Sequence, residues 1–131
     1  MDSYASNAVD SGSLIFDRQS ALEKVEGDEQ LLDELAEMFL EDCPSLSSAI
    51  FAAVEAKDCT ALTSAAHAMK GVVANFGSHA SEELARQLES MGRQQDLTDA
   101  EPVCVKLQAS LAGLQRELTA LVRHEPPQPS R

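Results

Sequence analysis

The sequence is poor in aromatic residues and in positive charge, and each shortage excludes a class of protein. Aromatic residues make up 4% of the 131 residues and tryptophan is absent. This argues against a sheet built on large aromatic and β-branched side chains. Lysine and arginine together number 10 against 22 acidic residues, for a formal net charge of −12. Because binding to a nucleic-acid backbone requires clustered cations, we expect no nucleic-acid partner.

Cysteines are few, and long apolar runs are absent. Cys43, Cys59 and Cys104 are odd in number and widely spaced, with neither a Cys-x-x-Cys pair nor histidines at ligand spacing. We therefore expect reduced thiols and no bound metal. No apolar run approaches the roughly 20 residues that span a bilayer, and the N-terminus lacks a basic segment followed by an apolar one. These absences predict a soluble, cytoplasmic protein without membrane association.

The composition predicts one domain between two tails. With 131 residues and an apolar content of 44%, the chain is long enough for one domain with one core and too short for two ordinary domains. Residues 1–13 are rich in Ser, Asp, Ala and Gly without periodicity, and residues 124–131 are rich in proline. We expect a flexible N-terminal tail, a domain over residues 14–123 and a disordered C-terminal tail.

Apolar residues between the tails repeat at helical spacing, and capping signals divide them into segments. Asp17, Asp28 and Asp58 stand at expected helix starts, and Thr98 with Glu101 forms a Thr-x-x-Glu capping box for the last helix. No strand pattern occurs. The expected fold is all-α, an antiparallel up-and-down four-helix bundle with a short extra N-terminal helix. We expect a monomer, because four apolar stripes can cover one another.

Further expectations concern single helices. Pro44 either begins a new helix or kinks a long one, and we favour one bent helix to about Ala56 because the apolar spacing continues in register. A polar loop is expected over residues 93–97. The expected packing residues include Ala80, Leu84, Leu88 and Met91 on the helix before that loop, and Met38 and Met69 on earlier helices.

One helix carries a histidine outside its apolar stripe. The stripe consists of residues three or four positions apart, namely Ala66, Met69, Val73 and Phe76. His67 lies off this stripe, and Lys70 and Gly71 share its side of the helix. A glycine inside a helix costs about 1 kcal/mol relative to alanine, so Gly71 suggests that something large approaches there. The pattern predicts an exposed imidazole beside one cation and an open notch.

His67, Lys70 and Gly71, with Gly77 six residues further on, resemble the signature of the histidine-phosphotransfer (HPt) domain family of two-component phosphorelays. The similarity extends over residues 16–122. It implies that His67 accepts a phosphoryl group from a receiver aspartate and passes it to another receiver. The receivers belong to response regulators or hybrid sensor histidine kinases. A neutral imidazole on an exposed helix face is a competent nucleophile for this step.

The resemblance also implies roles for the neighbours of His67. Lys70 stabilises the phosphate charge, Gly71 gives steric clearance, and Mg²⁺ is expected on the partner receiver, with no cofactor on this chain. Since no nucleotide-binding glycine loop occurs, we expect a relay intermediate without autonomous catalysis. Glu89 occupies a position that in some members holds a Gln near the phosphohistidine, and its contact with the site is left open. The expected docking residues are Thr63, Ser64, Ala68, Ala74, Asn75 and Arg93.

Two other functions compete with phosphotransfer. Val72 and Val73 make the flank of the site apolar, which favours an adaptor that binds a receiver or kinase without phosphate exchange. A hydrolase that uses His67 as a base is disfavoured, because no orienting Asp, Ser or Cys is expected beside the ring.

Overall fold

A computed structural model describes residues 15–124, which form five helices and no strand. The helices are α2 (Arg18–Lys24), α3 (Glu29–Ala56), α4 (Cys59–Ala74), α5 (His79–Gln94) and α6 (Ala100–Val122). The expected tails, residues 1–13 and 124–131, lie outside the described residues except for His124. None of the described helices is long and apolar enough to cross a membrane.

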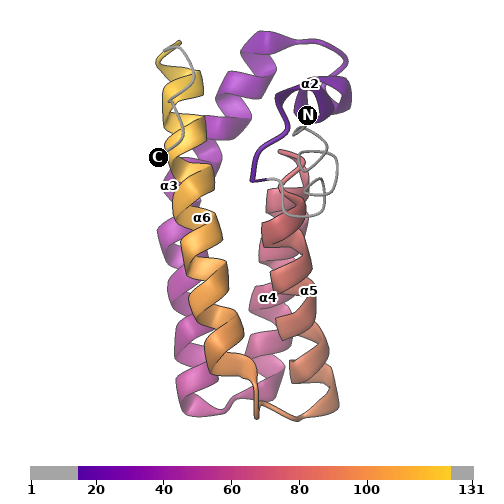
Figure 1. Ribbon diagram of the computed structural model, residues 1–131, viewed down its shortest axis with the longest axis vertical. Helices are drawn as coiled ribbons and strands as arrows, with labels where there is room; N and C mark the ends of the chain where they lie inside the picture. Colours follow the sequence, from indigo (N-terminus) through magenta and orange to yellow (C-terminus); the bar gives the residue numbers. More distant parts are fainter. Residues whose placement is uncertain (1–14, 125–131) are drawn as a thin grey trace, which may run out of the picture.

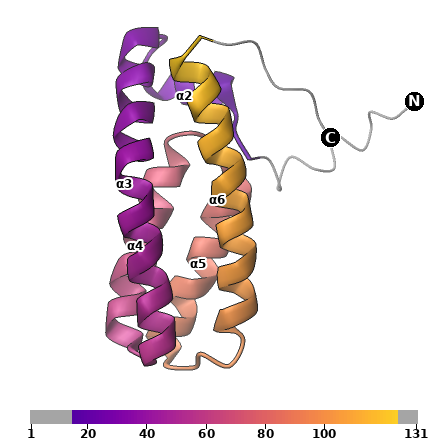
Figure 2. The same ribbon diagram turned by 90° about the vertical axis from the view of Figure 1, so that its left-hand side faces the viewer.

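The four long helices form an antiparallel bundle. Their connections alternate between the two ends of the molecule (Figures 1 and 2). Helix α4 packs against α3 and α5, and α6 packs against the same two helices from the other side. The short helix α2 lies at the end where α4 joins α5 (Figure 1). The predicted all-α bundle with a short extra N-terminal helix is confirmed.

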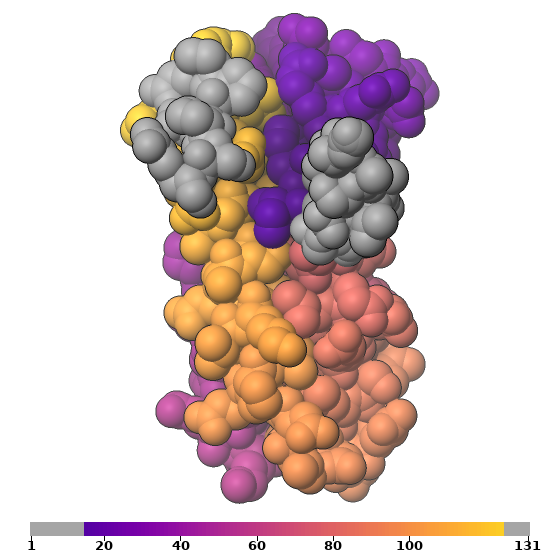
Figure 3. All heavy atoms as spheres, viewed as in Figure 1, coloured from indigo at the N-terminus to yellow at the C-terminus, as the bar shows by residue number. Residues whose placement is uncertain are grey.

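Aliphatic side chains fill the bundle, and three phenylalanines close one end. Phe76 packs against Phe39 and Phe16, with ring centroids 5.6 and 6.5 Å apart. Next to these rings, the Asp17 amide donates to the Phe76 carbonyl at 3.0 Å, which ties the start of α2 to the turn after α4. The side chains of α5 and α6 close over the space between their ribbons (Figure 3).

Helix α3 runs without interruption through Pro44, so the favoured single helix is confirmed. A proline cannot donate the usual helical hydrogen bond, but Pro44 is exposed, and water can satisfy the carbonyl left without a partner. The Asp17, Asp28 and Asp58 carboxylates each accept a backbone N–H of the first turn, at 3.0 to 3.1 Å. These three predicted caps are therefore confirmed.

The predicted Thr98–Glu101 capping box is wrong. Helix α6 begins at Ala100 with Asp99 at its N-cap, and no side chain caps it. Instead, the backbone N–H and the hydroxyl of Thr98 both donate to the Asp96 carboxylate, at 3.2 and 2.7 Å. A Thr98 hydroxyl that is hydrogen-bonded to Asp96 does not cap the helix that follows. The predicted loop also begins late, because α5 continues through Gln94.

The predicted apolar stripe of α5 is rotated by about one residue from the observed one. Ala80, Leu84 and Met91 are only half-buried, whereas Leu88 is buried as expected. The buried positions of α5 are Ser81, Ala85, Leu88, Glu89 and Gly92. The core face therefore includes two polar residues and a glycine, which hydrophobicity alone does not identify.

The two methionines predicted to pack on the earlier helices differ in burial. Met69 is buried as expected, but Met38 has 57% of its surface exposed, so its assignment to the core is wrong. The α3 face toward the core is supplied by neighbouring positions such as Phe39 instead. Cys43, Cys59 and Cys104 are free thiols, as their spacing predicts.

Candidate functional site

His67 projects from the middle of α4 into solvent. Ala66 and Met69 on the same helix are fully buried and fix the face that α4 turns toward the core. The His67 side chain is 65% exposed, as its position off the stripe predicts. One turn further on, a Cβ placed on Gly71 would meet no atom of the described residues within 4 Å, so this part of the structure leaves the space beside the ring open.

Glu89 on the neighbouring helix α5 contacts the imidazole and orients it. Its side chain is only 5% exposed, and both carboxylate oxygens are engaged. Oε2 accepts from Nδ1 of His67 at 2.8 Å and from Nη2 of Arg93 at 2.7 Å. Oε1 lies 2.7 Å from Nζ of Lys70. Helix α5 therefore supplies an anchor for the ring that α4 alone does not contain.

The environment of Glu89 keeps its carboxyl group ionised. The hydrogen bond from Lys70 is the largest influence and, with the hydrogen bond from His67 and the charges of Lys70 and Arg93, lowers the pKa of Glu89 to about 2. Burial acts in the opposite direction but is outweighed. An ionised carboxylate can only accept hydrogen bonds, so Nδ1 of His67 must carry the hydrogen. In the neutral ring the free lone pair then lies on Nε2.

The site carries an excess of positive charge in an acidic molecule. Lys70 and Arg93 together contribute two positive charges against the one negative charge of Glu89, whereas the whole chain has a formal charge of −12. Lys70 is 28% exposed and Arg93 is 64% exposed, so both cations reach the surface beside the ring. An anionic group can approach His67 here without meeting net negative charge.

A glycine brings α5 close enough to α4 for these contacts. A Cβ on Gly92 would lie 2.9 Å from the Cys59 carbonyl oxygen and 3.0 Å from the Thr63 nitrogen, and would also strike the Thr63 hydroxyl. That hydroxyl donates to the Cys59 carbonyl at 2.8 Å. Gly92 lies three residues after Glu89, so the close approach and the carboxylate belong to one turn of α5.

The sequence model of one family, described as the Hpt domain, matches residues 34–122, which is most of the chain. The chain belongs to the Hpt domain family. Hpt domains are phosphotransfer modules of phosphorelays that interact with receiver domains, and they are not enzymes with an ATP site of their own. The membership predicted from the histidine motif is therefore confirmed. No curated protein matches the chain.

Two solved structures share the fold of this Hpt domain. The HPT domain of the Hpt sensor hybrid histidine kinase from Shewanella has a TM-score of 0.76 at 20% identity, over 90% of this chain and 100% of that one. Histidine-containing phosphotransfer protein B from Pseudomonas aeruginosa PAO1 has a TM-score of 0.77 at 22% identity, over 85% and 96% of the two chains. These likenesses establish the bundle architecture.

The docking residues predicted for this Hpt domain occupy two kinds of position. Thr63 and Ala74 are half-buried, and the Thr63 hydroxyl is committed to the Cys59 carbonyl. The more exposed members of the set are Ser64, Ala68, Asn75 and Arg93. Arg93 differs from the other three because it also contacts Glu89, and it therefore belongs to the cluster around the imidazole.

The sequence left the contact of Glu89 with the site open, and Glu89 was not predicted to be the centre of the site. No Asp, Ser or Cys was expected beside His67, and a glutamate from the next helix takes the orienting place instead. One signal was available. An acidic residue directly after Leu88 and three before Gly92 falls on the buried face of α5, where a charge requires partners.

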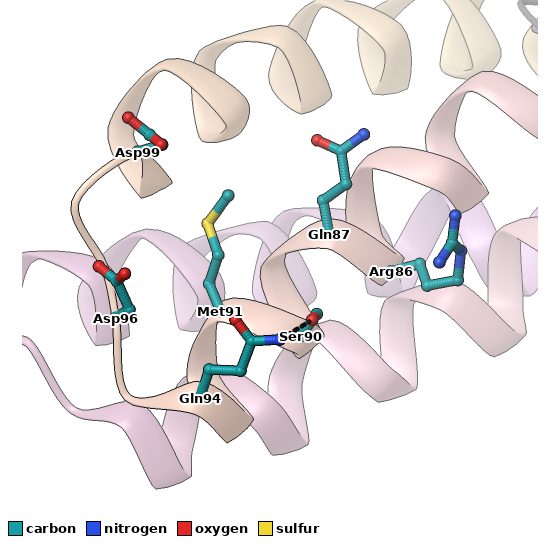
Figure 4. A pocket seen from close by; sticks show the side chains of 7 residues that line it. All are labelled: Arg86, Gln87, Ser90, Met91, Gln94, Asp96 and Asp99. Carbon is teal, nitrogen blue, oxygen red and sulfur yellow. Dashed lines mark hydrogen bonds between the residues drawn. The ribbon is translucent and has the colours of Figure 1, made fainter.

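The Hpt domain also has a pocket of about 330 Å³ between α5 and the start of α6 (Figure 4). Met91 points into it, and Asp96 and Asp99 lie at one end while Arg86 lies at the other (Figure 4). Neither His67 nor Glu89 lines it, so it is separate from the site on α4. Within residues 15–124, no group of three His, Cys, Asp or Glu side chains is arranged to hold a metal ion.

Proposed function

We propose that His67 accepts a phosphoryl group from a phosphorylated receiver aspartate and passes it to a second receiver. The observation that carries this proposal is the 2.8 Å contact between Nδ1 of His67 and the buried Glu89 carboxylate. It orients a 65% exposed ring with Nε2 as the nucleophilic atom. An oriented nucleophile at the surface, within a module that has no ATP site, requires the reactive phosphate to arrive on a partner.

The remaining requirements of phosphoryl transfer fall to the receiver. Transfer depends on in-line positioning and on stabilisation of charge around the equatorial oxygens, usually with a divalent metal. In this proposal the receiver brings the phospho-aspartate and its Mg²⁺, and this chain brings the imidazole. The excess positive charge of Lys70 and Arg93 favours the approach of the anionic group.

Lys70 has capacity for a second contact. Its ammonium group has three N–H donors, and Glu89 Oε1 takes one of them. We assign a remaining donor to a phosphoryl oxygen on His67. The contribution is modest, because a phosphoryl group on an exposed ring is well hydrated.

The receiver docks over the open surface around Gly71. Ser64, Ala68 and Asn75 are exposed and small, and they surround Gly71 on the outward face of α4. The open space at Gly71 allows a second protein to bring its own aspartate within bonding distance of Nε2. In this arrangement Arg93 meets the acidic rim of the receiver.

Label transfer from a phosphorylated receiver tests this function. We expect the wild-type chain to acquire label from a receiver domain in the presence of Mg²⁺, and His67→Gln to acquire none while keeping its helical circular dichroism spectrum. His79→Gln is the matched control, because His79 is an exposed histidine on α5 and should leave transfer unchanged. Binding of the receiver without label on the wild type would instead favour an adaptor that exchanges no phosphate.

A further inference from the structure

We propose, resting on the function above, that Glu89 is a positioning residue that keeps a proton on Nδ1 of His67 throughout the phosphoryl cycle. The phosphorylated ring then stays in the cationic form, which releases its phosphoryl group readily. Glu89 thereby makes the phosphorylated protein an active donor and shortens the life of its phosphohistidine.

The geometry supports retention of this proton. Oε2 of Glu89 lies 2.8 Å from Nδ1, and the carboxylate is 95% buried, so little water competes for the hydrogen bond. Helix α5 holds the carboxylate in place, because Lys70 and Arg93 engage it from two further directions. A fixed negative charge at this distance favours a positive ring over a neutral one.

The transfer steps balance without any movement of this proton. In the incoming step, the Nε2 lone pair attacks phosphorus, and the bond from phosphorus to the aspartate oxygen breaks with its electrons leaving on the carboxylate. The product ring has phosphorus on Nε2 and hydrogen on Nδ1, and it is cationic. In the outgoing step, a second aspartate oxygen attacks phosphorus, and the nitrogen–phosphorus bond electrons return to Nε2. The neutral ring is restored with the same Nδ1 hydrogen.

Loss of the Nδ1 proton would slow the outgoing step. The ring would then have to leave as an anionic imidazolate, which is a much poorer leaving group than neutral imidazole. Glu89 prevents this by stabilising the protonated form, so outgoing transfer should persist to higher pH than it would without the carboxylate.

The charges that face the ring act in opposite directions. Lys70 on α4 and Arg93 on α5 disfavour a cationic ring, but both are bound to Glu89, and the phosphoryl group adds negative charge that offsets them. From α3, which packs on the other side of α4, no charged side chain within residues 15–124 forms an ion pair with His67. Glu89 is therefore the only carboxylate of the described chain in direct contact with the imidazole.

Chemical phosphorylation gives a test that needs no natural partner. The wild type, Glu89→Gln and Glu82→Gln are phosphorylated with phosphoramidate, and loss of phosphate to water is followed by phosphorus NMR over a pH range on both sides of neutrality. Gln keeps the shape of Glu89 and can still accept from Nδ1, but it removes the charge. Glu82 is a partly exposed residue of the same helix and serves as the control.

We expect the alkaline fall in the rate of phosphate loss to occur about one pH unit lower in Glu89→Gln than in the wild type. At alkaline pH the variant phosphohistidine should then outlast that of the wild type about tenfold. Glu82→Gln should follow the wild type. Identical pH profiles for the wild type and Glu89→Gln would overturn the inference while leaving the proposed function intact.

A second measurement avoids substitution altogether. Nitrogen NMR of the phosphorylated wild type should show hydrogen on Nδ1 of His67 well into the alkaline range, and early loss of that hydrogen would overturn the inference. Failure of the wild type to form any phosphohistidine at residue 67 would overturn the proposed function itself, and the inference with it.

Discussion

At Gly71, the residue that best suits partner binding is not the residue that best stabilises the helix. No atom of residues 15–124 fills the space where its side chain would be, although helices favour almost any residue over glycine. The position therefore sacrifices some helix stability for an open surface beside His67. A side chain added here should affect a docked partner and leave the bundle intact.

We expect Gly71→Gln to fold with unchanged or higher stability and to accept phosphate from a receiver much more slowly. Glutamine is a good helix former, worth up to about 1 kcal/mol over glycine, but its side chain would occupy the docking surface. Urea unfolding and receiver-driven labelling measure the two effects. Ala109→Gln on α6 is the control, because it adds a similar side chain to an exposed position on another helix. Unimpaired labelling of Gly71→Gln would contradict the docking surface.

The residues of the site differ in how far the sequence reveals them. His67, Lys70 and Gly71 lie within one turn of a helix, so their shared face follows from helical periodicity alone. Glu89 and Arg93 reach the same place from α5, and their approach depends on the packing angle and rotation of a second helix. The predicted rotation of α5 about its axis was wrong by about one residue. For this reason, the sequence did not place Glu89 on the buried face of α5.

The α4–α5 pair is the element on which the site depends, because its close packing carries Glu89 to His67. Two glycines in these helices have contrasting surroundings. A Cβ on Gly92 would collide with backbone atoms of the first turns of α4, whereas a Cβ on Gly71 would meet no atom of the described chain within 4 Å. The same substitution at the two positions should therefore have opposite effects.

We expect Gly92→Ala to destabilise the protein by about 1 to 3 kcal/mol, the range for overpacking a filled interface. Gly71→Ala should stabilise it by up to about 1 kcal/mol through helix propensity. Chemical denaturation of the two variants measures both values. Equal and small effects would show that α5 does not need its close approach to α4.

Helix ends were predictable where one side chain decides them. Asp17, Asp28 and Asp58 each precede an apolar repeat and each cap the first turn as expected. Thr98 has the same local appearance but is bound by Asp96, two residues earlier. A capping signal thus fails where a nearby carboxylate offers the hydroxyl a shorter-range partner.

The stability of the whole molecule depends on pH through Glu89 and the side chains that contact it, namely His67, Lys70 and Arg93. The pKa of Glu89 is lowered from 4.5 to about 2 in the folded protein. A carboxyl group with a lowered pKa stabilises the fold at pH above its unfolded value and loses that contribution as pH falls through its folded value. The shift corresponds to up to about 3 kcal/mol.

We therefore expect the contribution of the Glu89 carboxylate to the difference in unfolding free energy between the wild type and Glu89→Gln to be fully present above about pH 4.5. It should shrink by up to about 3 kcal/mol as the pH falls from about 4.5 toward 2. Urea unfolding of both proteins across this range measures it. A difference independent of pH would show that the Lys70 and Arg93 contacts do not hold the carboxylate ionised.

The bundle architecture can be predicted from features that are evident in the sequence. Amphipathic repeats, short connections and the scarcity of aromatic residues together predict four antiparallel helices. The positions of polar residues inside the bundle are harder to predict from the sequence. Ser81 and Ser110 are buried and bonded to each other at 2.6 Å across α5 and α6, a pairing that no local pattern in either helix indicates.

The role of Glu89 in orienting His67 determines which ring nitrogen carries the phosphoryl group. The chain is phosphorylated by a receiver domain with Mg²⁺, and combined phosphorus and nitrogen NMR identifies the bonded atom. Because Glu89 holds Nδ1 at 2.8 Å, we expect a phosphoryl group on Nε2 of His67. A phosphoryl group on Nδ1, or on any residue other than His67, would contradict it.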